Sequence, residues 1–238
     1  MSGSARPAGP FAGVIFDLDG TLTRPGAIDF ARMRERIGMP EPGSILHWIE
    51  EHAGSEDEDE TMRAVVWEEE SLALGSMALG EGFADLVAAL IDVRGQLQTA
   101  ICTRNNVEAV EAFDRLLVQA GFPRADELFP VQIVRDHHSE RVGRPLLNKP
   151  SPEPAHEIKH RWGIIERYPL HEGDESEAPR YPDLIFVGDS EDDLLSGRRA
   201  GMAAAWMDHG TEPVSPHATH AFACLAECAA VLCAGGMP

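Results

Sequence analysis

The sequence predicts an open α/β fold, in which a parallel sheet carries helices on both faces. Short apolar, β-prone runs alternate along the chain with amphipathic helical patterns, the order typical of such sheets. Between residues 24 and 79, helical patterns follow one another with no strand between them. A length of 238 residues is enough for one or two domains. We therefore predict an α/β core over residues 11–23 and 80–238, and a small all-helical subdomain over residues 24–79.

Five short runs are the predicted strands of the core. Each is mostly apolar and is bounded by polar residues, a pattern typical of strands buried on both faces of a parallel sheet. The run at 130–134 is the weakest of them. In chain order they are 13–16, 97–102, 130–134, 184–187 and 203–207.

Four helical patterns lie between and beside these strands. One occupies residues 84–91, and another occupies 107–120 and ends at Gly121, a residue that commonly terminates helices. Ser151 followed by Pro152 predicts an N-cap and a first helical residue for the third. Ser190 is the predicted N-cap of the fourth, which Gly201 would end.

The segment without strands contains three helical patterns, at residues 28–37, 45–52 and 61–79. The acidic run at 55–60 precedes the third, and we predict it to be a solvated loop between helices. A second irregular stretch, 167–182, is rich in proline, glutamate and glycine and is predicted to be a surface loop.

The charge balance excludes several classes of partner. Lys and Arg number 20 against 40 Asp and Glu, giving a formal charge of −20, which repels nucleic acid and anionic membrane surfaces.

No stretch approaches the roughly 20 apolar residues that span a bilayer, and the first residues lack the apolar segment of a secretory signal. The four cysteines show no metal-ligand spacing, which favours free thiols in a reducing compartment. We expect a cytoplasmic protein, without excluding an organelle.

Asp17 and Asp19 directly follow the first predicted strand and carry the strongest chemical signal. Gly20 permits a turn through which both carboxylates can approach one cavity. Two acidic groups so close repel each other unless a cation or a shared proton relieves them. A hard divalent ion such as Mg²⁺ suits this arrangement. Because Asp-Gly is also a common turn signal, an ordinary surface turn remains the alternative.

Asp189 and Asp193 strengthen the case for a site, because they follow another predicted strand. In open α/β sheets, ligands bind at the carboxyl ends of the strands, and Asp17 and Asp189 both follow such ends. Asp189 would be a further metal ligand. Asp193 has two interpretations, a residue of the site and a capping partner of Ser190, and one side chain can serve in both.

The remaining candidates come from two other segments. Thr103 ends the second predicted strand and is followed by Arg104 and Asn105, so a hydroxyl and backbone N–H groups could bind an anion there. Lys149 precedes a predicted helix within a proline-rich stretch. A lone lysine in such a loop is usually a solvated charge, so Lys149 is a candidate site residue only in combination with the other motifs.

Together these motifs resemble those of the haloacid dehalogenase superfamily, on its phosphatase side. That family orders its motifs as Asp-x-Asp-x-Thr after the first strand, Thr or Ser after the second, then Lys, then Gly-Asp-x-x-x-Asp. The resemblance covers about residues 13–205 and implies a Rossmann-like core. The segment 24–79 is similar to the small helical cap of phosphoglycolate-phosphatase-like members, whereas the long linker at 167–182 departs from the family. The matching residues are Asp17, Asp19, Thr21, Thr103, Lys149, Gly188, Asp189 and Asp193.

The resemblance also implies roles. Asp17 would attack phosphorus and form an aspartyl-phosphate, while Asp19 would protonate the leaving oxygen and then activate water. Thr103 and Lys149, with Arg104 and Asn105 beside Thr103, would bind the phosphate oxygens. Mg²⁺ would be held by the carboxylates of Asp17 and Asp189 and the backbone carbonyl of Asp19. Thr21 and Asp193 would support this arrangement.

A Mg²⁺-dependent phosphatase of small phosphate monoesters is the function that this resemblance favours. A phosphomutase needs the same residues and stays open, as does a catalytically silent phosphate-binding or scaffold protein. Dehalogenase relatives lack the second acid, so Asp19 argues against them. The expected partner is a small phosphate ester, with neither nucleic acid nor membrane, and the sequence does not indicate an oligomeric state. Arg24, Arg32 and His47 are candidates for contacts with the rest of the ester.

Overall fold

A computed structural model of the chain describes residues 10–40, 43–166, 180–211 and 213–234. These residues divide into two units. The insert is formed by Pro25–Met77, and the core by the described residues before and after it. No helix among the described residues is long and apolar enough to cross a membrane.

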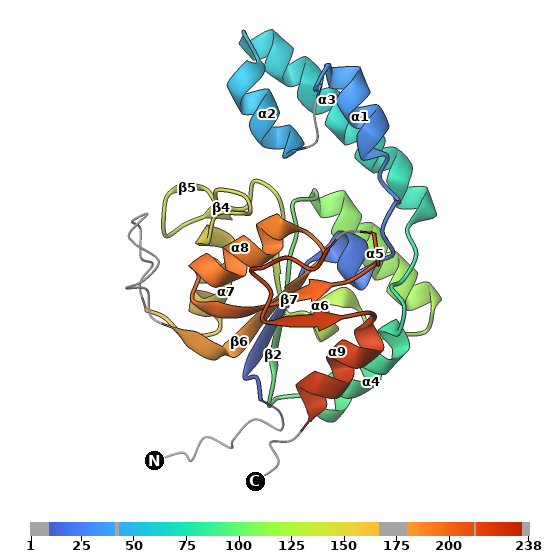
Figure 1. Cartoon of the computed structure of the whole chain (residues 1–238), viewed down its shortest axis with the longest axis vertical. Helices are drawn as coiled ribbons and strands as arrows, with labels where there is room; N and C mark the ends of the chain where they lie inside the picture. The colour runs from blue at the N-terminus through green and yellow to red at the C-terminus, as the bar shows by residue number, and fades with distance from the viewer. Residues whose placement is uncertain (1–9, 41–42, 167–179, 212, 235–238) are drawn as a thin grey trace. The chain divides into compact units, whose positions relative to one another are not determined.

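The core is built on a six-stranded sheet whose neighbouring strands are all parallel (Figure 1). This confirms the predicted fold class, and all five predicted strands are present. The strands lie in the order β3-β2-β1-β6-β7-β8. Their bounds are β1 Gly13–Phe16, β2 Gln98–Cys102, β3 Val131–Ile133, β6 Tyr181–Gly188, β7 Met202–Met207 and β8 His220–Phe222.

Two features of the strands differ from the prediction. β6 begins at Tyr181 rather than at 184, because Tyr181 N donates to Gly201 O and so extends the pairing with β7 past an irregular register. The predicted surface loop is therefore wrong at Tyr181 and Pro182, and its residues 167–179 lie outside the described residues. β8 and the small hairpin of β4 (His138–Ser139) and β5 (Arg144–Pro145) were not predicted.

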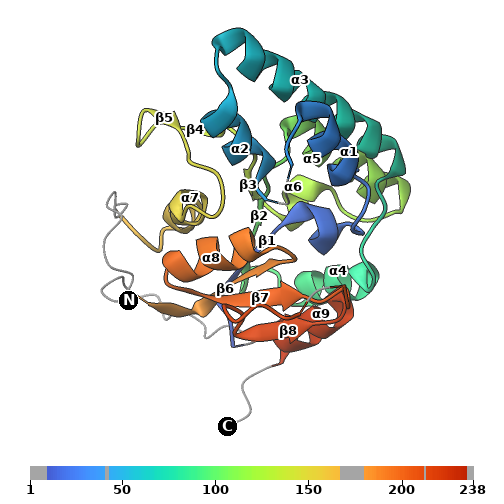
Figure 2. The ribbon, with the colours of Figure 1, turned by 45° about the horizontal axis from the view of Figure 1, so that its top comes forward.

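Helices cover both faces of the sheet (Figure 2). α7 (Glu153–Arg161) and α8 (Glu191–Arg199) lie on one face, where Ile158 of α7 joins a buried cluster with Ile15 and Phe186. The described part of the core also contains α4 (Phe83–Asp92), α5 (Val107–Gln119), the short α6 (Ala125–Leu128), α9 (Leu225–Cys233) and a short helical turn, Leu18–Leu22, directly after β1. Phe83 of α4 packs edge-on against Phe113 of α5, with ring centroids 5.8 Å apart. Burial on both sides explains the unbroken apolar runs in the strands.

The two helix starts predicted from serines differ in detail. Ser190 is the N-cap of α8, as predicted, and forms a reciprocal capping box with Asp193. Ser151 was predicted to be the N-cap of α7, but the N-cap is Pro152 and the helix begins at Glu153. The Ser151 hydroxyl nevertheless accepts a hydrogen bond from Glu153 N at 3.3 Å. The capping bond therefore forms, with the helix starting one residue later than expected.

The insert is helical throughout its regular structure, with α1 (Phe30–Ile37), α2 (Ile45–His52), α3 (Glu56–Ala73) and a 3₁₀ turn at Leu74–Ser76. The predicted loop at 55–60 is wrong, because the acidic run forms the first turns of α3 behind Ser55, whose side chain accepts from Glu58 N. Acidic side chains stabilise a helix N-terminus, where the backbone N–H groups carry partial positive charge. At its other end, α3 stops at Ala73, whereas the predicted helix continued to residue 79.

Ion pairs and a buried apolar cluster stabilise the insert. Met33, Ile49 and Val66 contribute to that cluster from three different helices. Arg36 Nη1 lies 2.8 Å from Glu69 Oε1, and Arg32 Nε lies 3.1 Å from the same oxygen. Arg32, a sequence candidate for substrate contact, is therefore already paired with a carboxylate that is 3% exposed.

The chain leaves and re-enters the core at neighbouring points. Arg24 N donates to Ala78 O at 2.8 Å, and Thr23 pairs with Leu79 in an isolated antiparallel bridge. Backbone hydrogen bonds therefore hold together the two points at which the insert is joined to the core.

Candidate active site

The candidate site lies where the carboxyl ends of β1, β2 and β6 meet. Asp17 follows β1, Thr103 follows β2, and Asp189 follows β6. Because these strands are adjacent and parallel, residues widely separated in the sequence come together at one edge of the sheet.

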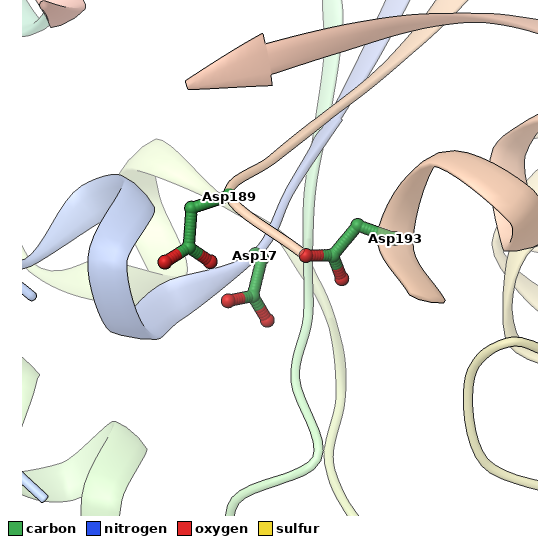
Figure 3. A group of neighbouring side chains, drawn as sticks. All are labelled: Asp17, Asp189 and Asp193. Carbon is green, nitrogen blue, oxygen red and sulfur yellow. The ribbon is translucent and has the colours of Figure 1, made fainter. Parts of the chain in front are cut away.

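Three carboxylates form the centre of the site (Figure 3). Asp17, Asp189 and Asp193 each offer an oxygen, and these oxygens all lie within 4.8 Å of one another. Asp193 comes from the first turn of α8 and completes a cluster to which sequence reasoning had assigned Asp17, Asp19 and Asp189. Hard carboxylate oxygens are the ligands that Mg²⁺ prefers, so the donor set fits that ion.

Lys149 compensates part of this negative charge. Its Nζ lies 2.5 Å from Asp17 Oδ1 and 2.5 Å from Asp193 Oδ1, and donates to Cys102 O at 2.9 Å. Burial by itself would lower the pKa of Lys149, but Asp17 and Asp193 raise it above its ordinary value. Lys149 is therefore a buried ammonium ion, and not the solvated loop charge that its sequence context alone would suggest.

Lys149 does not compensate the whole negative charge of the carboxylates. Burial raises the pKa of Asp17 to about 7, with Lys149 lowering it and Asp193 raising it. Burial and then repulsion from Asp17 and Asp193 raise the pKa of Asp189 to about 8. Near neutral pH the cluster must hold protons or bind a cation. This is the electrostatic setting expected of a divalent metal site.

Asp19 lies beside this cluster with its side chain engaged elsewhere. Its carboxylate accepts hydrogen bonds from Asn105 Nδ2 and, at 3.3 Å, from Thr23 Oγ1. Burial raises the pKa of Asp19 above its ordinary value, although both hydrogen bonds lower it. The pKa of Asp19 is therefore raised by burial while its carboxylate is held in place by two side chains.

Thr103 and its neighbours form the other side of the site. The Thr103 hydroxyl is buried and accepts from Asn105 N at 3.1 Å, which shapes the turn after β2. The Arg104 guanidinium pairs with Asp192 of α8. Arg104 was predicted to bind substrate; its guanidinium also pairs with a carboxylate of the protein, and its substrate-binding role stays a prediction. The Thr21 hydroxyl is buried and has no hydrogen-bond partner among the described residues.

Asp193 combines the two interpretations that its sequence position left open. Oδ2 accepts from Ser190 N at 3.1 Å and from Ser190 Oγ at 2.6 Å, while Oδ1 faces Lys149. The same carboxylate therefore caps α8 and pairs with the buried lysine.

Glycines allow the carboxylates to pack this closely. Gly20 has φ +72°, and a Cβ built on it would overlap the Asp189 carboxylate. A Cβ on Gly188 would likewise overlap the Asp193 side chain. Any larger residue at either position would displace an acid of the cluster.

Three contacts of the site escaped sequence reasoning. Thr23 binds Asp19, Asp192 pairs with Arg104, and the ring of His209 lies 2.5 Å from Gly20 O. Asp192 and Thr23 adjoin recognised motifs, so proximity in sequence was an available signal. His209 follows β7, and a lone histidine after a strand carries no such signal.

Known proteins share the sequence pattern and the fold of this chain. Residues 11–201 match a family model described as haloacid dehalogenase-like hydrolase. An uncharacterized hydrolase of Saccharomyces cerevisiae, YOR131C, is 30% identical over 189 residues, covering 79% of this chain and 73% of that protein.

Solved structures share the fold at lower identity. A predicted phosphoglycolate phosphatase from Haemophilus somnus superimposes with a TM-score of 0.58 at 19% identity, over 92% of this chain and 96% of that one. The Bacillus subtilis protein YfnB, in a structure bound to magnesium, superimposes with a TM-score of 0.52 at 21% identity, over 96% of this chain and 99% of that one.

Proposed function

Because the chain belongs to the haloacid dehalogenase-like hydrolases, we propose that it is a Mg²⁺-dependent phosphatase acting on a small phosphate monoester through an aspartyl-phosphate. The observation that carries the proposal is the buried Lys149 ammonium between Asp17 and Asp193, with Asp189 completing the acidic cluster. Positive and negative groups concentrated at one sheet edge suit phosphoryl transfer, in which charge must be stabilised at several oxygens.

The first chemical step would be attack by Asp17. A carboxylate oxygen of Asp17 forms a bond to phosphorus while the bond from phosphorus to the ester oxygen breaks. Asp19 gives its proton to that departing oxygen, so the product leaves as an alcohol. The raised pKa of Asp19 favours the protonated form that this step needs.

The second step would regenerate the enzyme. A water oxygen attacks phosphorus, the bond to the Asp17 oxygen breaks, and inorganic phosphate is released. Asp19, now a carboxylate, accepts a proton from that water. One residue therefore serves as acid and then as base, and its two hydrogen bonds keep it at the same place for both steps.

Lys149 and Thr103 would bind the phosphoryl oxygens. Lys149 carries its charge into the site, and the Thr103 hydroxyl keeps its own proton to donate, since its oxygen accepts from Asn105 N. Mg²⁺ would be held by Asp17, Asp189 and the Asp19 backbone carbonyl, and would supply positive charge beside the transferring group. Asp193 would orient Lys149.

The insert would act as a cap that selects the ester. The groups proposed for phosphoryl transfer all belong to the core, and phosphoryl chemistry alone does not distinguish one alcohol from another. A helical unit of its own, joined to the core beside Thr23, is a suitable source of that discrimination.

Phosphate release from p-nitrophenyl phosphate tests the function. Protein stripped of metal with a chelator should be inactive and should recover on addition of Mg²⁺. The Asp17→Asn variant, purified in the same way, controls for contaminating phosphatases. Turnover that is unaffected by metal removal would contradict the Mg²⁺ requirement. Exchange of phosphate between sugar positions without release of inorganic phosphate would favour a phosphomutase instead, and binding without either reaction would favour the silent alternative.

A further inference from the structure

We propose that His209 is a positioning residue that holds the Asp19–Gly20 turn in the geometry required for proton transfer to the leaving group. This inference rests on the proposed phosphatase function. His209 Nε2 lies 2.5 Å from the backbone oxygen of Gly20, the residue that directly follows Asp19. A carbonyl oxygen can only accept a hydrogen bond, so Nε2 carries the proton and donates it.

The loop that carries His209 is itself held in place. Asp208 N donates to Phe222 O at 2.8 Å, which ties the start of the loop to β8. Gly210 N donates to Asp208 Oδ1 at 2.7 Å, closing a tight turn around His209. Gly210 has φ +70°, a conformation that glycine adopts without strain. The imidazole is thus presented on a hydrogen-bonded turn at the start of the connection from β7 to β8.

His209 approaches the Asp19–Gly20 turn from the side of β1 opposite to Asn105. Asn105, which follows β2, binds the Asp19 carboxylate from one side of β1. His209, which follows β7, reaches Gly20 from the other side, past the end of β6. Asp189, which follows β6, packs on the same side as His209, where a Gly20 side chain would lie. Loss of the His209 contact would therefore loosen that side of the turn and leave the Asn105 contact in place.

The consequence falls mainly on one step of the reaction. Displacing the Gly20 peptide moves the backbone of Asp19, whose carbonyl is also the proposed Mg²⁺ ligand, whereas Asp17, Lys149 and Asp193 keep their mutual contacts. Saturating Mg²⁺ in the assay separates weaker metal binding from weaker proton donation. Misplacement of Asp19 should therefore weaken proton donation more than it weakens attack by Asp17. Proton donation matters most for esters whose leaving oxygen is strongly basic.

Two aryl esters of the same shape separate these effects. The nitro group of p-nitrophenyl phosphate stabilises the departing phenolate, so this ester needs little protonation, whereas phenyl phosphate needs more. We compare kcat/KM for both esters in wild type, His209→Ala and His209→Gln, because Gln can place a donor near the position of Nε2. Asp19→Asn provides the reference pattern for loss of the proton donor, and circular dichroism checks that each variant folds.

The expected result is a loss of roughly tenfold on phenyl phosphate in His209→Ala, a fraction of the 10²–10⁴ that a general acid contributes, with a smaller loss on p-nitrophenyl phosphate. His209→Gln should recover most of the activity. Equal losses on both esters in a folded His209→Ala variant, or no loss on either, would overturn the inference while leaving the phosphatase function intact. A wild-type protein that hydrolyses neither ester in the presence of Mg²⁺ would overturn the proposed function itself.

Discussion

Replacing Lys149 with Met removes the buried positive charge of the site and keeps most of the side-chain stem. In the native protein the Lys149 side chain is 2% exposed and faces carboxylates that are 10% (Asp17) and 1% (Asp193) exposed. Removing one partner of a buried ion pair leaves an uncompensated charge, which costs about 3–5 kcal/mol. We expect the metal-free variant to lose stability of that order at pH 8.

Lys159 provides a matched control. It is buried as deeply as Lys149, but its Nζ donates to Ala200 O at 2.6 Å and lies over the Tyr181 ring. Burial lowers the pKa of Lys159 to about 7, so at pH 8 it is mostly uncharged. Lys159→Met should therefore cost about 0.5–1.5 kcal/mol, the contribution of one hydrogen bond.

The loss in Lys149→Met should also depend on pH. In the native protein the folded-state pKa of Asp17, about 7, lies above its value of 3.8 in an unfolded chain. The folded state therefore binds more protons between these values, and stability falls as the pH rises through this window. Without Lys149 the pKa values of Asp17 and Asp189 rise further, so the variant should be less destabilised at pH 6 than at pH 8.

Urea unfolding of the metal-free proteins at pH 6 and pH 8, followed by circular dichroism, measures both effects. The two lysine variants should differ by about 1.5–4.5 kcal/mol at pH 8, from the ranges given for a broken buried ion pair and a lost hydrogen bond. Equal destabilisation of Lys149→Met and Lys159→Met at pH 8 would refute the view that Lys149 neutralises the acidic cluster.

Three further predictions concern other parts of the molecule. Asp19→Asn should lower turnover by roughly 10²–10⁴ and leave Mg²⁺ affinity nearly unchanged in calorimetry, because its backbone carbonyl is the proposed ligand. A collapse of affinity would mean that the proposed division of roles between Asp17 and Asp19 is wrong. Replacing Pro25–Met77 with a short Gly-Ser linker should spare slow hydrolysis of p-nitrophenyl phosphate and sharply lower kcat/KM for the preferred ester found in a metabolite screen; equal losses in a folded core would mean that the insert does not select substrate. Ser55→Ala should destabilise the protein by about 1 kcal/mol in thermal unfolding through loss of the N-cap of α3, and an unchanged midpoint would contradict the capping role.

The sequence predicted the sheet well because its central strands are buried on both faces. β1 is a continuous apolar run and β2 ends in the apolar, buried residues Ala100, Ile101 and Cys102, and each is followed by a polar residue, so their carboxyl ends could be located. β8 has only three residues, partly exposed, and offers no such pattern. The acidic run before α3 was misassigned because its composition suggests solvation, whereas Ser55 and the partial charge of the helix end decide its conformation.

The candidate site could be predicted where residues sit in short motifs at strand ends. Asp17 and Asp189 are such residues, and the structure brings them together across neighbouring strands. Contacts between distant segments could not be predicted, since pairing of Arg104 with Asp192, or of His209 with Gly20, depends on how loops from different strands are oriented. Arg104 shows the limit most clearly, because its position in the sequence suggests an anion site while its partner is an aspartate.

The central claim is that Asp17 carries the phosphoryl group during turnover. Rapid acid quenching of the reaction followed by mass spectrometry of peptides locates any covalent phosphoryl group. The account predicts a phosphorylated Asp17 in the wild-type protein, and no adduct with nearly complete loss of turnover in Asp17→Asn, since removing a nucleophile costs up to about 10⁶ in kcat. A phosphoryl group on another residue, or an Asp17→Asn variant that keeps more than roughly a tenth of the wild-type rate, would contradict it.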